Sequence, residues 1–162
     1  MEGKNHMIKF TKNDAKYACF SNFYPCDISY EGISYSSTEA AWQSLKTLDP
    51  DIRKRFSTYT AAGAKRMGRS VALRPDWEEV KYDLMVKVCY EKFTQNTDLG
   101  EILLSTKDEE IVENTTGWHD NIWGNCECER CRNKPGKNLL GKALMEVRGL
   151  LKGAKPNADT ES

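Results

Sequence analysis

Apolar residues recur at helical spacing in two long stretches, about 76–94 and 138–151, whereas strand-like alternation never runs beyond a few residues. The first stretch carries a stripe of Trp77, Val80, Leu84 and Val88, broadened by Val86, Tyr90 and Phe93. In the second, the inward residues are expected to be Leu139, Leu140, Ala143, Leu144, Val147, Leu150 and Leu151, after a cap at Asn138. Long helices with only short strands predict a helix-rich α+β fold.

Short extended segments are expected at two places, Met7–Phe10 and Glu110–Glu113. A β-hairpin is expected around Glu31-Gly32, because Ile28, Tyr30, Ile33 and Tyr35 alternate with polar residues there. Shorter helices are expected over about 38–48, 50–56, 61–67 and 98–104. The first of these would place Ala41, Trp42, Leu45 and Leu48 inward. The stretch 114–137, rich in Gly, Asn, Cys and Trp, is predicted to be a long ordered loop of the kind that usually serves function.

The chain has 162 residues, which is the usual size of one domain. We expect a single domain over residues 1–152 and a disordered polar tail over 153–162. Lys+Arg and Asp+Glu both number 24, so the formal net charge is zero, which argues against a protein that binds mainly to phosphate backbones. The first thirty residues lack an apolar signal region and no apolar run could span a membrane, so we expect a cytoplasmic protein with no membrane partner.

Cys126, Cys128 and Cys131 form a C-x-C-x-x-C motif. Tetrahedral zinc takes four Cys or His ligands, and this spacing suits two or three of them. The fourth ligand would have to come from His119, Cys19, Cys26 or Cys89. We expect free thiols, with structural zinc as the less favoured alternative and a redox pair less favoured again, because no strand-to-helix context surrounds the motif.

Two carboxylates have both a structural and a chemical interpretation. Asp120 lies between Trp118 and Trp123, where it could perform acid–base chemistry or simply bind nearby loop amides. Glu39 follows Ser37-Thr38 at the expected start of a helix, where an acidic side chain stabilises the helix N-terminus. Basic residues in the middle of the chain could be a solvated face or could bind a phosphate; they are Arg53, Lys54, Arg55, Lys65, Arg66 and Arg69.

Several short motifs occur in a characteristic order. They are Phe20–Pro25, Ser37-Thr38-Glu39 leading through Gln43 to Lys46, Gly63–Arg69, Arg74–Trp77 with Met85 and Lys92-Phe93, Ile111–Glu113, Asp120 with Trp123-Gly124, and Gly136–Gly141 with Leu144-Met145 and Val147-Arg148. This series resembles the YbiA-like family, also called NADAR, over about residues 17–151. The resemblance implies a YbiA-like fold and N-glycosidase chemistry on ribosylated compounds.

The resemblance implies a small-molecule substrate that carries a phosphorylated ribosyl or ADP-ribosyl group. Such substrates are the ribosylamino-pyrimidine phosphates of riboflavin biosynthesis or an ADP-ribosylated guanine; nucleic acid would be a partner only through an ADP-ribosylated base. The positions that act at the ribose would be Glu39, Trp77 and Asp120. Residues expected to bind or frame the substrate are Phe20, Ser21, Asn22, Lys46, Arg66, Arg69, Trp123, Gly124 and Asn138. Neither a catalytic metal nor a cofactor is expected.

Breaking a ribosyl C–N bond builds positive charge on the sugar, so the reaction needs an anion beside the ring and a poised water. We expect Asp120 to activate the water or stabilise the cation and Glu39 to hold the ribose hydroxyls or share the proton transfer, although the two roles could be exchanged. Trp77 would form a stacking wall.

The chain departs from the family pattern at two places. Ala40 stands where many members have histidine, and residues 125–135 are longer than usual and carry the cysteines. The first departure bears on the substrate and the second on the shape of the pocket rim. Two alternatives to the enzyme are also open. One is a non-catalytic module that binds ADP-ribose or an NAD metabolite, and the other is an interaction protein built on a zinc loop over Cys126–Cys131.

Overall fold

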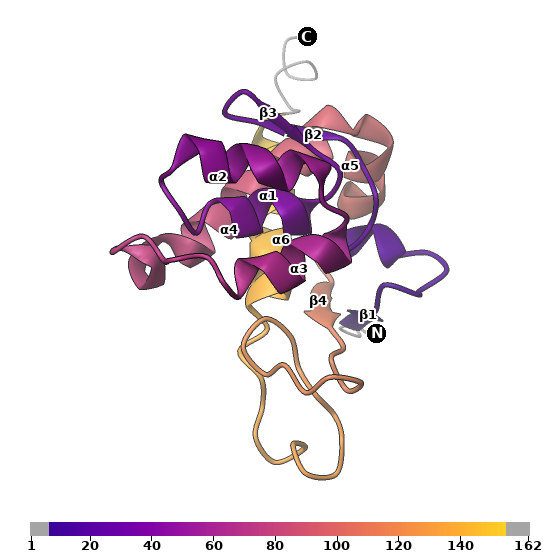
Figure 1. Cartoon of the computed structure of the whole chain (residues 1–162). Coiled ribbons are helices and arrows are strands. Elements are labelled where there is room, and N and C mark those ends of the chain that lie inside the picture. Colours follow the sequence, from indigo (N-terminus) through magenta and orange to yellow (C-terminus); the bar gives the residue numbers. More distant parts are fainter. Residues whose placement is uncertain (1–6, 155–162) are drawn as a thin grey trace, which may run out of the picture. The chain divides into compact units, whose positions relative to one another are not determined.

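The computed structural model describes residues 7–154, and it is a helix-rich α+β structure with two two-stranded sheets in that part of the chain (Figure 1). This confirms the predicted fold class. The chain divides into two compact units, one formed by residues 22–100 and one by residues 1–21 with 101–162. The predicted single domain over residues 1–152 stays a prediction.

The unit of residues 22–100 begins with a β-hairpin of β2 (Ile28–Tyr30) and β3 (Ile33–Tyr35). The strands pair antiparallel, with Ile28 opposite Tyr35. Glu31 and Gly32 both have positive φ, 49° and 85°, which is the backbone of the tight turn that the sequence predicted. Gln95 fixes the hairpin edge because its side-chain amide accepts from the Ser29 N–H and donates to the Ser29 carbonyl, both at 2.8 Å.

Helix α1 (Thr38–Ser44) is capped by Ser37, whose Oγ accepts from the Ala40 N–H at 3.1 Å. Every residue of α1 is buried, and the helix packs against α3 (Ala61–Gly68) and α4 (Trp77–Gln95) (Figure 1). The prediction that this helix reaches about Leu48 was wrong. The chain leaves the helix after Ser44 with tight three-residue hydrogen bonds, and Leu48 is 59% exposed.

The remaining helices of this unit follow their predicted starts. Asp49 caps α2 (Pro50–Arg55), which is followed by a 3₁₀ turn over Phe56–Thr58, and Thr60 caps α3 through the Gly63 N–H. Helix α4 faces the core with a different stripe from the predicted one. Val80 and Leu84 are half-buried, and the fully covered residues are Trp77, Met85, Val86, Val88, Cys89, Lys92 and Phe93. Apolar residues surround much of this helix, so periodicity alone could not select its buried face.

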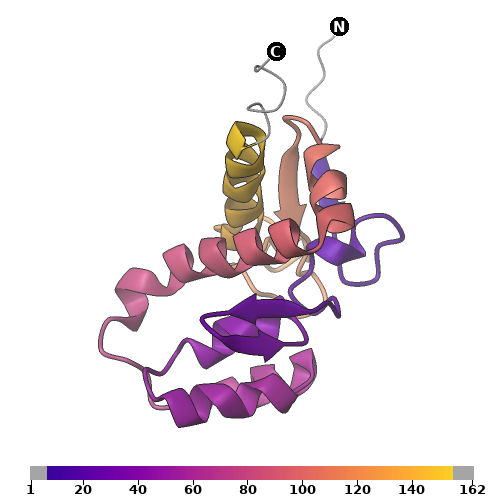
Figure 2. The ribbon, with the colours of Figure 1, turned by 90° about the horizontal axis from the view of Figure 1, so that it is seen from above.

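In the other unit, β1 (Met7–Phe10) pairs parallel with β4 (Glu110–Glu113), and both strands were predicted. Figure 2 shows α6 (Leu139–Ala154) running alongside β4, and the two elements pack together. The core residues of this unit include Phe10, Phe20, Ile111, Leu140, Leu144 and Val147. The predicted inward position of Leu150 was wrong, since it is 49% exposed.

Two short helices complete the described chain, the 3₁₀ turn Ala18–Phe20 and α5 (Thr97–Leu104). Residues 114–138 form a long loop without helix or strand, as predicted (Figure 1). Gly153 and Ala154 still belong to α6, and the rest of the predicted tail lies outside the described residues. None of the described helices combines the length and apolar character needed to cross a membrane.

Candidate functional site

The start of α1 holds Glu39 at a fixed position. Its backbone N–H donates to the Asn22 carbonyl at 3.0 Å, and the Thr38 hydroxyl donates to Asn22 Oδ1 at 3.0 Å. The Asn22 amide in turn lies 3.6 Å from the sulfur of Met85 on α4. Asn22 therefore positions the helix start, and its place in a substrate pocket stays a prediction.

Glu39 and Gln43 form a buried polar pair one helical turn apart. The Glu39 side chain is 7% exposed, and its Oε2 accepts a hydrogen bond from Gln43 Nε2 at 2.7 Å. Gln43 Oε1 is also buried and has no hydrogen-bond partner within the described part of the chain. Gly68 makes room for this amide, because a methyl group at Gly68 would overlap it. A buried acceptor without a donor is costly, so this oxygen is suited to a hydroxyl supplied from outside the protein.

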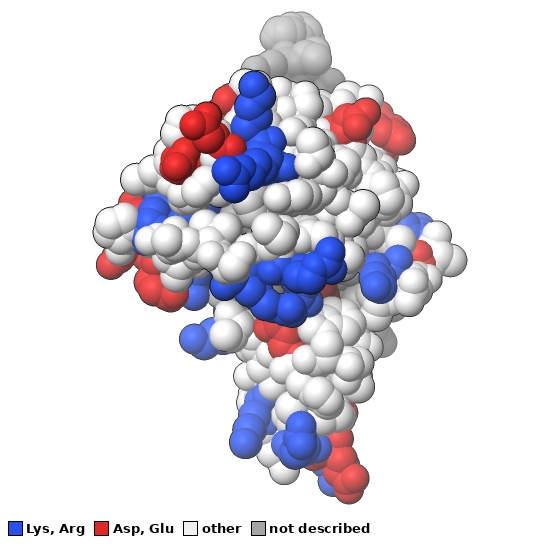
Figure 3. All heavy atoms as spheres, in the orientation of Figure 1, with Lys and Arg blue, Asp and Glu red and all other residues white. Residues whose placement is uncertain are grey.

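Basic side chains lie near this pair. Lys46 is half-buried, donates to the Gly68 carbonyl at 3.3 Å, and lies 5.7 Å above the ring of Trp42. Burial lowers the pKa of Lys46, the charge of Glu39 opposes this, and the charge of Arg69 adds to it. Figure 3 shows basic side chains gathered over α3, where Arg66 and Arg69 are exposed. These groups could hold a phosphate.

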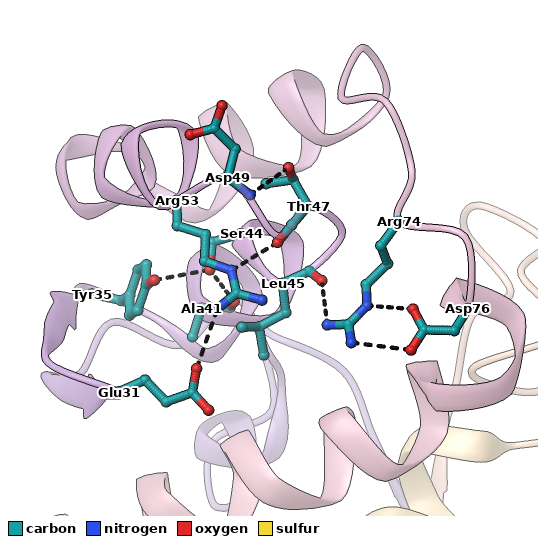
Figure 4. Close-up of polar contacts among 10 residues, drawn as sticks. All are labelled: Glu31, Tyr35, Ala41, Ser44, Leu45, Thr47, Asp49, Arg53, Arg74 and Asp76. Atoms are coloured by element: carbon teal, nitrogen blue, oxygen red, sulfur yellow. Dashed lines mark hydrogen bonds and ion pairs between the residues drawn. The ribbon is translucent and has the colours of Figure 1, made fainter.

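Trp77 begins α4 and is only 5% exposed. Its ring packs on Trp42, with centroids 5.1 Å apart and planes tilted by 53°. Arg74 holds the segment that precedes α4. Its guanidinium donates to both carboxylate oxygens of Asp76, at 2.6 and 3.2 Å, and to the Leu45 carbonyl at 3.4 Å (Figure 4). The structure places Trp77 as a packing residue, and its contact with a substrate stays a prediction.

Asp120 lies in the long loop of the other unit. Its Oδ1 accepts from the N–H groups of Ile122 and Trp123, at 2.8 and 2.9 Å. The Thr115 hydroxyl donates to the Asp120 carbonyl at 2.7 Å. Asp120 therefore binds loop amides, one of its two expected roles, and these bonds also fix the direction of a half-buried carboxylate.

Asn138 joins the loop, β4 and α6. It adopts positive φ, 53°, while its side chain accepts from the Glu113 N–H at 3.1 Å and donates to the Ile111 carbonyl at 2.9 Å. Asn138 directly precedes α6, as predicted, and its backbone carbonyl accepts from the Lys142 N–H at 3.0 Å, whereas its side-chain hydrogen bonds go to β4. Gly124 accepts from the Asn138 N–H at 3.2 Å, and any side chain at Gly124 would overlap Thr115.

Phe20 and Ser21 are buried framework. The Phe20 ring meets Phe10 edge-on at 5.7 Å and stacks on Tyr17 at 5.1 Å. The Ser21 N–H donates to the Ala18 carbonyl at 3.0 Å. These contacts assign both residues to the core of their own unit.

Within residues 7–154, one group of side chains is spaced for a metal ion: His119, Cys126, Cys128 and Cys131. None of the residues expected to act on the ribose belongs to it. Two thiols of this group differ in acidity. Burial raises the pKa of Cys126 to about 11, whereas the hydrogen bond from Cys126 lowers the pKa of Cys128 to about 6.

The NADAR domain model matches residues 9–152. The chain belongs to the NADAR family. The family relative "N-glycosidase YbiA" of Shigella boydii is 35% identical over 145 residues, covering 88% of this chain and 86% of that protein. A "Riboflavin biosynthesis protein" of Vibrio vulnificus is 33% identical over 152 residues, covering 92% of this chain but 40% of that protein. The NMR structure of Escherichia coli YbiA superposes with a TM-score of 0.81 at 34% identity and covers 95% of this chain and 89% of the YbiA chain.

This NADAR chain is therefore an N-glycosidase, a hydrolase of N-glycosyl bonds. The sequence motifs identified the family, but they did not assign a role to Gln43. Its place four residues after Glu39 was the available signal, because such residues are neighbours on one helix face.

Proposed function

We propose that this NADAR protein hydrolyses the C–N glycosidic bond of a phosphorylated ribosyl or ADP-ribosyl compound. The observation that carries the proposal is the buried acceptor pair on α1, in which Glu39 lies beside a Gln43 oxygen that has no donor in the described chain. The 2′- and 3′-hydroxyls of a ribose are two adjacent donors, and they match the adjacent acceptors of Glu39 and Gln43.

The charge of Glu39 suits the transition state of this reaction. As the C–N bond breaks, the ribose gains oxocarbenium character, and a preorganised carboxylate stabilises it most strongly where water is excluded. Glu39 is 7% exposed, and Gln43 holds its Oε2 at 2.7 Å, so the carboxylate needs little reorganisation.

The phosphate end of the substrate is assigned to the basic residues at the C-terminal end of α3, Arg66 in the helix and Arg69 directly after it. Arg66 and Arg69 have exposed guanidinium groups, which bind phosphate oxygens in pairs. The partly buried Lys46 contributes a further positive charge close to Glu39. A substrate with both groups would place its ribose at Glu39 and Gln43 and its phosphate at Arg66 and Arg69.

Asp120 is assigned the second carboxylate role, activation of water, because it matches the acidic position before the Trp-Gly pair of the family. Two backbone amides hold Oδ1 and so fix the orientation of this carboxylate. Neither carboxylate needs a metal for these roles.

A panel of ribosyl compounds tests the proposal. Purified protein is incubated with a ribosylamino-pyrimidine phosphate, NAD, ADP-ribose and an ADP-ribosylated guanine nucleotide, and mass spectrometry detects free base and sugar. We expect cleavage of one class, with a rate loss of about 10²–10⁴-fold in Glu39→Gln and in Asp120→Asn. Glu78→Gln, an exposed acid on α4, is the matched control and should keep full turnover.

Full turnover in both carboxylate variants would contradict their assigned roles. Binding of a panel member without release of its base would assign that compound to recognition alone, as in the binding module considered from the sequence. Cleavage of an unphosphorylated nucleoside as fast as its phosphate would contradict the role of Arg66 and Arg69.

A further inference from the structure

We propose that the long loop holds one structural zinc ion, bound by Nδ1 of His119 and the thiolates of Cys126, Cys128 and Cys131. The ligands do not include any residue proposed to act on the ribose. The site does not depend on the proposed substrate.

The spacing of the four ligand atoms carries the proposal. They all lie within 4.8 Å of one another. With Zn–S bonds of about 2.3 Å, two sulfurs on one ion can be at most ~4.6 Å apart and lie ~3.8 Å apart in a tetrahedron. His119 Nδ1 lies 3.2 Å from Cys126 Sγ and 3.5 Å from Cys128 Sγ, which is close to the spacing of ligands on one ion. Small adjustments of side chains would complete the site.

The backbone around the cluster holds the ligands together. The N–H groups of Cys131 and Arg132 both donate to the Cys128 carbonyl, at 3.0 and 2.9 Å, which turns the chain back on itself. The Cys128 N–H points to Cys126 Sγ at 3.5 Å, and such N–H bonds stabilise a thiolate ligand. His119 takes a left-handed backbone, with φ 60°, which brings its ring toward the cysteines.

The ligand types select the metal and its role. Three sulfurs and one imidazole are soft ligands that favour zinc over magnesium or calcium, which prefer oxygen. Four protein ligands fill a tetrahedron, so no position is left for water or substrate, and this is the pattern of structural rather than catalytic zinc.

The ion would add to the hydrogen bonds that already hold this segment, such as those of Asp120 and Asn125. Residues 114–138 contain no helix or strand, and Trp118 and Ile122 in this loop are 44% and 48% exposed. A metal that joins His119 to the cysteines would cross-link a segment without regular secondary structure, as in small metal-stabilised domains. Because Asp120 follows His119 directly, the ion would also limit the movement of that carboxylate.

Metal content of the full-length protein, purified reduced and without chelator, tests the site. We expect about one zinc ion per chain by inductively coupled plasma mass spectrometry. Cys128→Ser and Cys131→Ser should lose the ion, whereas Cys26→Ser, at a half-buried cysteine outside the cluster, should retain it. Retention of zinc by both cluster variants would overturn the assignment.

Cobalt titration of the wild-type protein gives a second test, which does not depend on whether the variants fold. Metal-free wild-type protein should take up one Co²⁺ and develop the visible absorption of a tetrahedral site together with thiolate-to-cobalt charge-transfer bands. A protein with all six thiols reduced that gives neither band and holds no zinc would overturn the proposal, as would a stable disulfide within the cluster. These readouts need no substrate, so loss of turnover in Asp120→Asn with zinc retained would concern the proposed function alone.

Discussion

At the scale of single residues, Gly68 determines whether Gln43 can remain beside Glu39. Gly68→Ala should displace the Gln43 amide, because the new methyl group would occupy its place. We expect a loss of about 1–3 kcal/mol in the free energy of unfolding and at least a tenfold fall in kcat/KM. Thermal melts and kinetics check both effects.

Gly149→Ala is the matched control for this change. Gly149 lies on α6 with open space around it, so alanine there should be neutral or slightly stabilising, by up to ~1 kcal/mol. A Gly68→Ala protein that behaved like Gly149→Ala would contradict the proposed importance of the Gln43 position.

The buried thiol of Cys89 should make stability depend on alkaline pH. Burial raises its pKa to about 12. Above the ordinary thiol pKa, the unfolded chain loses this proton while the folded chain keeps it, so the free energy of unfolding falls as pH rises toward 12. The loss should be roughly 1–2 kcal/mol at pH ~10.

Denaturant unfolding of wild type and Cys89→Ala across pH ~8–10.5 isolates this effect. The variant loses packing by an amount that does not depend on pH, and the stability difference between the two proteins should shrink as pH rises. A constant difference over the whole range would show that Cys89 does not titrate as described.

At the scale of elements, Asn138 is the link between β4 and α6. Its side chain satisfies the Glu113 N–H and the Ile111 carbonyl, and Asn138→Ala would leave both without that partner. We expect a loss of about 2–4 kcal/mol in the free energy of unfolding. Asn133→Ala, at an exposed loop position, should change stability by less than ~0.5 kcal/mol. Equal stability of the two variants would contradict the proposed link.

The elements show which structural features the sequence could predict. The start of α1 was predictable because Ser37 is a local capping signal, whereas its end was not, since the exposure of Leu48 depends on distant packing. Strands β1 and β4 were found, but local pattern carries no information about their pairing partner. Likewise, the motifs indicated Glu39, while the role of Gln43 required the position of Gly68 on another helix.

At the scale of the whole molecule, positive and negative residues are equal in number but unevenly distributed over the surface. The formal net charge is zero, yet basic side chains gather over α3 (Figure 3). Attraction of a phosphorylated substrate should therefore come from this patch, and salt should raise KM by screening it. In the double variant Arg66→Gln/Arg69→Gln, KM should rise by about 1.5–5-fold for each charge removed and depend much less on salt, because an exposed charge pair is worth about 0.2–1 kcal/mol.

Steady-state kinetics from ~0.02 to ~0.5 M salt checks this dependence. Lys54→Gln/Arg55→Gln is the control, because these exposed basic residues lie on α2 and not on α3. A control that lost its salt dependence as fully as the α3 variant would assign the effect to general surface charge.

The parallel pairing of β1 with β4 imposes an order on biosynthesis. Met7 leaves the ribosome long before its partner Glu110. At ~5–20 residues per second, the first strand waits roughly 5–20 s for the second. The continuous segment 22–100, which forms a compact unit of its own, is complete before β4 is synthesised. Strand β1 is thus synthesised long before it can pair, and until then its edge is open to association with other strands.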